Sequence, residues 1–408
     1  NYYKYLEDMF ELLRHVRKNL PLAKKALLMR VYITLHHFAP IKAVDECDIV
    51  LKKLKQYKMV DDRPFCLSIM ELKAHALMNA GLYPDGEILL KEIQADWLCN
   101  KEILSDETLF DLYDRLAAVY RAFNLIDLSK TYNTLSITLA DKLDDNRLRA
   151  LAYRTKFKIT LYPNMDLSSE SLRKSIEATA LMPSKRIETD NSLDVCALEI
   201  LSNSTVHQDK LILKLNSMLQ DIEANNLHRA QIHCFFLLAI CNLLKSEEKA
   251  TLLAKEYVDR AINLSTSYGI VGYLWRLYNL QAIIGIRMGF DSQHIYKIFF
   301  TVFDILKKQG LLYIGNRDAC EGNILALSNI GYYLQERKFE SQFYQTMSLV
   351  TFAGQEYSAY PNQNLSDNPV NTFLVQQYAK ARKREILFAQ NTPSNLLWDT
   401  QTRYLLIL

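Results

Sequence analysis

The histidines and cysteines of this chain have side chains that could hold a metal or attack a substrate, and their spacing tests both ideas. His36 and His37 are adjacent, and a helix would point them about 100° apart rather than at one metal ion. Cys234 and Cys241 lie seven residues apart and share a helix face, with His233 beside the first. We interpret both as core cysteines, because free cysteine packs like a small hydrophobic residue. We therefore expect no metal site.

Catalytic signatures are missing from the sequence. It contains no H-E-x-x-H, G-x-S-x-G or G-x-G-x-x-G pattern and no phosphate-binding loop of the form G-x-x-x-x-G-K-[ST]. Its seven cysteines are scattered and never form C-x-x-C. Such cysteines are typical of reduced thiols in a cytoplasmic protein. We expect a protein that is not an enzyme and has no cofactor, and we keep a helical enzyme as the third of three hypotheses.

Acidic pairs at 61–62, 144–145 and 247–248 are the next candidates for chemistry. Each pair stands where the surrounding pattern predicts the start of a helix. A carboxylate at that position accepts hydrogen bonds from the first backbone N–H groups and complements the helix dipole. Capping therefore explains these clusters without catalysis.

Charge and hydropathy exclude two further classes of function. The 408 residues include 49 basic and 46 acidic ones, a net charge of +3, which argues against direct nucleic-acid binding by this segment. We interpret the basic cluster from 380 to 384 as an exposed helix face. No apolar run approaches the roughly 20 residues of a membrane span. With 49% hydrophobic residues, 11 glycines and 9 prolines, the composition favours packed helices.

Pairs of amphipathic helices recur about every forty residues and are the elements that must position any site. The expected pairs are 23–38 with 41–57, 64–80 with 85–98, 106–123 with 126–143, 144–161 with a partner opening near 168, 190–203 with 208–224, 227–244 with 247–266, 270–288 with 292–309, and 317–336 with 338–351. Flanking helices are expected at 1–19 and 370–389. Pro183 suggests a division into N-terminal repeats (1–183), C-terminal repeats (184–352), and a loop with a capping helix (353–408).

The paired segments resemble tetratricopeptide (TPR) repeats. In that family small residues let paired helices approach closely, and an aromatic residue follows three positions after the first of them. The matching residues here are Gly331, Ala117 and Ala74 in first helices, Tyr120 as the aromatic, and Ala254 and Ala261 in a second helix. The resemblance implies an all-α, right-handed α-solenoid of about eight antiparallel helix pairs. Its long, degenerate repeats look like those of bacterial peptide-pheromone receptors and of the sensor arms of signal-transduction ATPases.

First helices of such an array would line a concave groove, and polar side chains on them are candidate ligand contacts. Arginine can clamp a carboxylate, and asparagine can satisfy both polar groups of a peptide bond. The residues that the repeat alignment directs to the groove are Arg276, Asn279, Asp114, Arg121, Arg154, Tyr332 and Gln335, with Glu71 and His75 near the first end.

Our leading hypothesis is a sensor arm of a bacterial cytoplasmic regulator that binds a peptide or protein in this groove. The alternative is a structural scaffold or oligomerisation module, and a homodimer fits either reading. The chain begins without methionine and ends on apolar residues, so we expect a piece of a longer protein. A neighbouring helix-turn-helix or ATPase domain would be the recipient of the signal.

Overall fold

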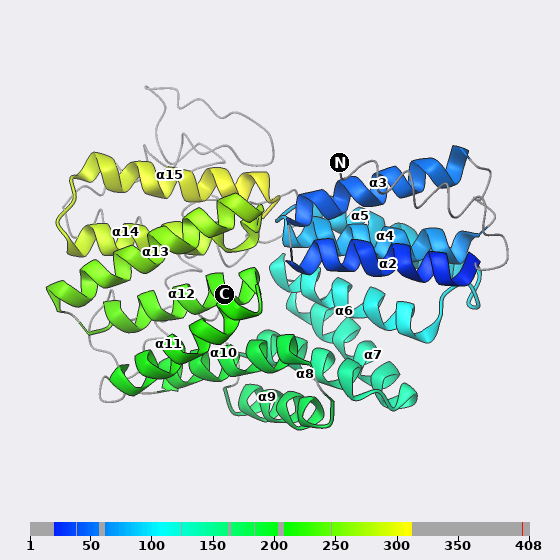
Figure 1. Cartoon of the computed structure of the whole chain (residues 1–408), viewed down its shortest axis with the longest axis horizontal. Helices are drawn as coiled ribbons and strands as arrows, with labels where there is room; N and C mark the ends of the chain where they lie inside the picture. The colour runs from blue at the N-terminus through cyan, green and yellow to red at the C-terminus, as the bar shows by residue number, and fades with distance from the viewer. Residues whose placement is uncertain are drawn as a thin grey trace, which may run out of the picture.

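The computed structural model shows an all-helical array (Figure 1). It describes residues 20–311, except 38, 57–61, 124, 162–164, 183, 203–207 and 246, together with residue 402. Within these residues there is no β-strand, and 14 α-helices follow one another along the chain. The predicted all-α solenoid-like architecture is therefore confirmed. The expected helices at 1–19, 317–336, 338–351 and 370–389 lie outside the described residues.

Seven helix pairs make up the described array, each helix packing on the next. The first and second helices of the pairs are α2 (Leu20–His37) and α3 (Pro40–Gln56), α4 (Arg63–Asn79) and α5 (Tyr83–Cys99), α6 (Asp106–Ala122) and α7 (Ile126–Leu143), α8 (Asn146–Thr160) and α9 (Met165–Ala180), α10 (Lys185–Ser202) and α11 (Gln208–Ala224), α12 (His228–Leu243) and α13 (Glu248–Tyr268), and α14 (Leu274–Arg287) and α15 (Ser292–Lys308). A short 3-10 helix, η3 (Val271–Tyr273), leads into α14.

Most helix boundaries agree with the sequence pattern to within a few residues, and the exceptions have local causes. Helix α2 begins at Leu20 and includes Pro21, so it starts three residues before the expected position 23. Proline is tolerated in the first turn because the N–H that it lacks has no partner there. Helix α10 begins at Lys185, five residues earlier than expected. Asp190 and Asn191, which mimic a helix start in the sequence, lie inside α10 and use their side chains for contacts with other helices.

Polar side chains begin several helices as predicted. The side chain of Asp62 accepts a hydrogen bond from the Phe65 N–H at 3.3 Å, and Asp145 accepts two, from residues 147 and 148. Ser105 caps α6 in the same way. Glu247 precedes α13 without a side-chain cap, so the capping interpretation holds for two of the three acidic pairs.

Small residues hold the two helices of a pair close together. Ala117 is fully buried in α6, and its backbone oxygen accepts a hydrogen bond from Ser129 Oγ of α7 at 2.7 Å. In the preceding pair, a Cβ added to Gly86 of α5 would lie 3.3 Å from the backbone oxygen of Ala74. A larger side chain at either contact would push the helices apart, which is the physical reason for small residues there.

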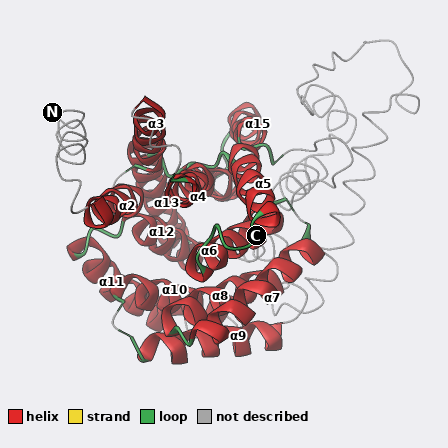
Figure 2. Ribbon diagram, turned by 90° about the vertical axis from the view of Figure 1, so that its right-hand side faces the viewer, coloured by secondary structure: helices red, strands yellow, loops and turns green. Residues whose placement is uncertain are grey.

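The array curls until its beginning meets its end (Figure 2). Tyr32 of α2 lies 3.4 Å from Arg186 of α10, measured between the hydroxyl oxygen and a guanidinium nitrogen. Helix α4 packs against η3, and Gly310, just after α15, lies against Pro84 at the start of α5. We call these contacts between α2–α5 and the later helices the seam. Because of the seam, the first helices surround an interior instead of an open, extended groove as we expected.

Helix α12 forms the centre of the second half. All but four of its sixteen residues are buried, because α10, α11, α13 and α14 all contact it. Both Cys234 and Cys241 are fully buried there, and Cys234 Sγ donates to the backbone oxygen of Leu215 at 3.4 Å. Their interpretation as core cysteines is confirmed. Within the described residues, every helix is too short or too polar to cross a lipid bilayer.

Candidate ligand pocket

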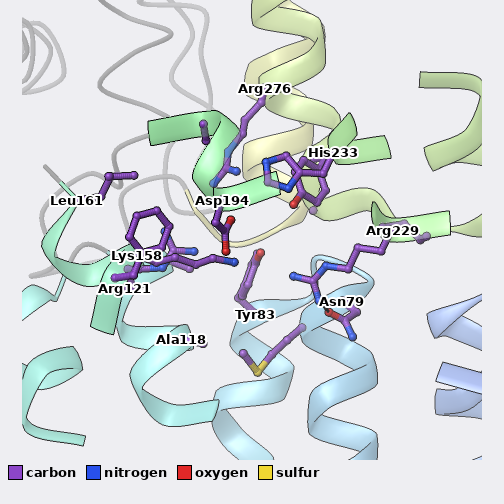
Figure 3. Close-up of a pocket in the computed structure, with 17 residues that line it drawn as sticks. Asn79, Tyr83, Ala118, Arg121, Lys158, Leu161, Asp194, Arg229, His233 and Arg276 are labelled. Carbon is purple, nitrogen blue, oxygen red and sulfur yellow. Dashed lines mark hydrogen bonds between the residues drawn. The ribbon is translucent and has the colours of Figure 1, made fainter. Parts of the chain in front are cut away.

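A pocket of about 150 Å³ lies in the interior, beside the seam (Figure 3). Its walls come from the first helices α4, α6, α8, α10, α12 and α14, with the start of α5 and η3 completing them. The polar lining residues are Asn79, Tyr83, Arg121, Lys158, Asp194, Arg229, His233, Tyr273 and Arg276. Residues from both ends of the curled array therefore line the pocket. No two consecutive helix pairs contain all of these residues.

Cationic side chains dominate the lining. Burial, together with the nearby charge of Arg154, lowers the pKa of Lys158 to about 7. Burial also lowers the pKa of Arg276, to about 10, and that of Arg121. Arg229 stands at the more open side, where it donates to the side-chain oxygen of Asn79 at 2.9 Å. Four positive groups therefore converge on a small, partly enclosed volume.

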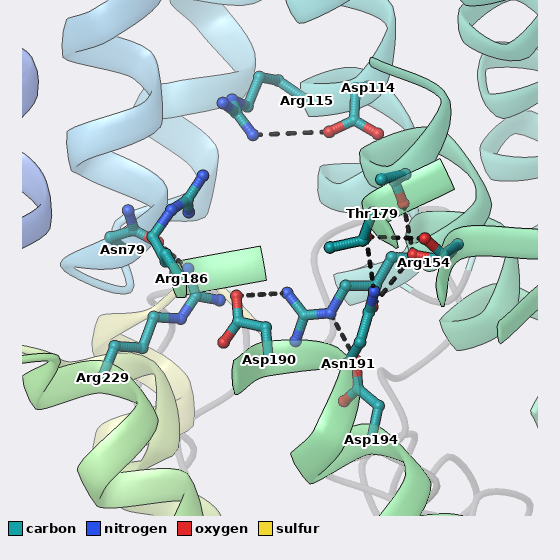
Figure 4. A network of polar contacts seen from close by, with 12 residues as sticks. Asn79, Asp114, Arg115, Arg154, Thr179, Arg186, Asp190, Asn191, Asp194 and Arg229 are labelled. Carbon is teal, nitrogen blue, oxygen red and sulfur yellow. Dashed lines mark hydrogen bonds and ion pairs between the residues drawn. The ribbon is translucent and has the colours of Figure 1, made fainter. Parts of the chain in front are cut away.

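One arginine organises the acidic side of the pocket (Figure 4). Arg154 of α8 donates through Nε to Asp194 at 2.5 Å and through Nη1 to Asp190 at 2.8 Å. Burial raises the pKa of Asp190, but Arg154 lowers it more, to about 2. The pKa of Asp194 is lowered by the same balance. Both carboxylates are therefore ionised and paired with Arg154, and Asp194 also attracts the Lys158 ammonium group.

Aromatic rings and a neutral histidine complete the lining. Burial lowers the pKa of His233 to about 4, so this ring is uncharged at neutral pH. It lies beside Tyr273 with 5.8 Å between ring centroids, and the Arg276 guanidinium lies 5.6 Å from the same tyrosine ring. An arginine over an aromatic face is partly stabilised by the ring and keeps a fixed direction.

A second buried charge cluster continues along the first helices toward α4. Arg115 Nε lies 3.4 Å from Glu71 Oε1, and Arg115 Nη1 lies 3.5 Å from Asp114. Asp114 also accepts a hydrogen bond from Thr155 Oγ1 of α8 at 2.7 Å. Burial and the charge of Asp111 raise the pKa of Glu71 to about 8. This cluster ties α4, α6 and α8 together and has its hydrogen-bonding capacity used internally.

The structure separates the predicted groove residues into three groups. Arg121 and Arg276 line the pocket, and Arg154 supports it through Asp194. Asp114, Glu71 and His75 are buried, and Asn279 is fully buried with its amide donating to the Trp275 backbone oxygen at 3.0 Å. The placement of Asn279 toward an open groove is corrected, since the helix turns its side chain into the core. Tyr332 and Gln335 lie outside the described residues.

Sequence reasoning missed most of the polar lining, notably Lys158, Asp194, Arg229 and His233. A signal was present in the sequence, because three successive first helices each carry two ionisable residues spaced four apart. These pairs are Arg154 and Lys158, Asp190 and Asp194, and Arg229 and His233. Residues four apart share a helix face. Three such faces pointing inward predict a charged interior.

The described lining of the pocket offers charged, aromatic and apolar groups that can contact a ligand. None of the described lining residues is a serine, threonine or cysteine. A search of the described part of the chain finds no cluster of three or more potential metal ligands. The lining supplies fixed positive charge, two phenol groups and apolar wall, which suits recognition of a ligand.

Comparison with known proteins adds no name to this description: no family model matches the chain, and no curated protein sequence matches it. The TPR resemblance of the repeats stays a prediction.

Proposed function

We propose that this chain is the ligand-binding array of a bacterial cytoplasmic regulator, receiving a peptide or protein in its interior and responding through its curvature. The observation that carries the proposal is the composition of the pocket wall. Side chains from α4 and α5 at one end of the curl and from η3 and α14 at the other line the same volume. A ligand seated there contacts both ends at once, so binding is coupled to the closure of the array.

The seam gives this coupling a movable element. Its contacts include two exposed hydrogen bonds, of Arg229 with Asn79 and of Arg186 with Tyr32, whereas neighbouring helices within the array bury continuous apolar surface. A modest difference in ligand affinity between closed and open forms is enough to shift such an equilibrium. A domain attached to either end of the chain would then sense the ligand as a change in spacing.

The scaffold alternative has weaker support. Among the described residues, the most exposed large apolar side chains are those of Leu181, which follows α9, and Leu213 of α11. Scattered exposed leucines are normal on soluble proteins and need no partner. A stable dimer seen by light scattering, unaffected by blocking the pocket, would favour the scaffold.

Blocking the pocket tests the proposal. Ala118 lines it, and Ala118→Trp would fill the volume, whereas Leu213→Trp adds the same ring on an exposed position of α11. Peptides selected from a random linear library against the wild type should bind Leu213→Trp with unchanged affinity and lose binding to Ala118→Trp. Small-angle scattering should show a smaller radius of gyration in the complex. Equal binding to both variants would overturn the proposal.

A further inference from the structure

The pocket carries more positive than negative charge, and the surplus comes from separate helices. Its cations are Arg121 of α6, Lys158 of α8, Arg229 of α12 and Arg276 of α14. Among the described lining residues, the one carboxylate is that of Asp194, which pairs with Arg154. A partly buried surplus of this kind is costly without a counter-charge, because low polarity strengthens repulsion.

We propose that the pocket is an anion subsite, which takes one carboxylate or phosphate group of the ligand. This inference rests on the proposed function and names the chemistry that its ligand must present. Arginine forks and a lysine ammonium are the groups that proteins use for both anions. The two tyrosine hydroxyls, of Tyr83 and Tyr273, lie on the same lining and add neutral donors.

Lys158 is the lining cation best placed to receive an anion. Among the described residues it makes no hydrogen bond or ion pair, although its neighbours Arg154 and Thr155 on the same helix are fully engaged. Figure 3 shows its side chain directed into the interior, between Arg121 and Tyr83. An anion bound here would restore the favourable interaction that burial removes from the ammonium group.

The volume of the pocket limits the size of the group that it can hold. About 150 Å³ is less than the roughly 300–1,000 Å³ of pockets that enclose whole drug-sized ligands. The pocket therefore holds a group, such as a peptide carboxyl terminus or a phosphate, while the rest of a larger ligand lies beyond it.

Repulsion between the cations gives the anion a mechanical role. Burial lowers the pKa of Arg121, and the charge of Arg229 also lowers it. Burial likewise lowers the pKa of Arg276, and the charges of Arg121 and Arg229 also lower it. These groups belong to α6 on one wall and to α12 and α14 on the other. Like charges on these residues therefore repel one another across the interior. A bound anion removes this repulsion and favours the closed seam.

The test measures binding of small anions to the whole chain by calorimetry and by thermal unfolding at constant ionic strength. The probes are inorganic phosphate, acetyl-dialanine with a free carboxylate, and the amide of the same dipeptide. We expect at least one of the two anions to bind and raise the melting temperature, and the amide to do neither. Phosphate alone would identify a phosphate group as the ligand feature, and the free dipeptide alone would identify a carboxylate.

Variants assign the effect to the pocket. Lys158→Met and Arg276→Gln should each weaken anion binding ~10- to 100-fold, the usual worth of a hydrogen bond to a charged group. The matched controls Lys130→Met and Arg173→Gln remove exposed charges on α7 and α9 and should bind as the wild type does. Lys158→Met should also raise the melting temperature of the ligand-free protein, a gain that mere damage to the fold cannot produce.

Two results would overturn the inference: no binding of either anion to the wild type, or undiminished binding to both pocket variants. The proposed function is judged separately. Suppose that a library peptide loses affinity for Ala118→Trp but binds Lys158→Met and Arg276→Gln with unchanged affinity. That result would support the ligand-binding array and contradict the anion subsite.

Discussion

Arg229 at the start of α12 donates a hydrogen bond to the side chain of Asn79 at the end of α4, across a sequence separation of 150 residues. Both residues line the interior pocket, and their contact is part of the seam. A helical array without such a return contact would be an open spiral. Here the return contact makes the pocket a property of the whole curl.

Removing Arg154 should destabilise the protein strongly. Arg154→Met leaves Asp190 and Asp194 ionised and partly or fully buried without their partner. Breaking a buried pair from one side costs about 3 kcal/mol or more. Urea unfolding at neutral pH measures the loss. The control is Arg149→Met, which removes an arginine paired with the exposed Asp141 and Asp144 and should cost less than about 1 kcal/mol. Similar losses for the two variants would contradict the special role of Arg154.

The ion pairs of Arg154 with Asp190 and Asp194 should make the stability of the fold sensitive to acid. Arg154 lowers the pKa of Asp190 to about 2 in the folded chain. A depressed carboxyl pKa stabilises the folded state above the unfolded pKa of about 4, and this stabilisation is lost as the pH falls toward 2. Urea midpoints measured between pH 5 and pH 2.5 should therefore fall less steeply in Asp190→Asn than in the wild type, since the variant has no such proton to take up.

How much of this was predictable depends on the range of the interactions. Local apolar spacing predicts the helix pairs. Ala117 marks a contact between paired helices, and Asp145 marks the start of a helix. Arg121 and Arg276 were placed inward because they stand on first helices. Asn279 was misplaced because a rotation of one residue turns a helix by about 100°. The pairing of Arg229 with Asn79 depends on the summed curvature of four helix pairs, which no local pattern encodes.

Anion affinity should depend on pH through Lys158. Its pKa of about 7 means that the ammonium form dominates below pH 7 and is lost as the pH rises above it. His233, with a pKa of about 4, stays neutral, and Arg276, with a pKa of about 10, stays charged over this range. Sulfate keeps a constant charge, so its affinity should fall by up to about tenfold per pH unit above pH 7. Lys158→Arg should bind with little pH dependence, and a wild-type profile as flat as this would contradict the assignment.

Gly310 should control the closure of the seam. It has φ +64°, and an added Cβ would overlap the Pro84 ring at the start of α5. Gly310→Ala should therefore cost about 1–2 kcal/mol for the left-handed backbone and more for the clash. Gly289 is the matched control, with φ +71° and no atom within 4 Å of an added Cβ. Gly289→Ala should show the backbone cost alone and leave the radius of gyration unchanged, whereas Gly310→Ala should increase it.

Glu46 is fully buried in the first helix pair, and one oxygen of its carboxyl group has no hydrogen-bond partner among the described residues. Thr34 Oγ1 donates to Glu46 Oε1 at 2.8 Å, and Oε2 has no hydrogen bond among the described residues. Burial raises the pKa of Glu46 to about 8. A raised carboxyl pKa means that the folded chain binds one more proton than the unfolded chain between about pH 4.5 and pH 8, so folding becomes less favourable as the pH rises through that window.

Glu46→Gln keeps the shape and removes the titration. Its stability should match that of the wild type near pH 5 and exceed it at pH 9 by on the order of 3 kcal/mol, measured by urea unfolding at both pH values. Glu71 also has a raised pKa, so the wild-type slope contains its contribution as well, and the comparison with Glu46→Gln isolates the share of Glu46. A variant that is equally destabilised at both pH values would show that Glu46 is ionised in the folded chain, and that α2 and α3 are held together by its charge rather than by a neutral carboxyl group.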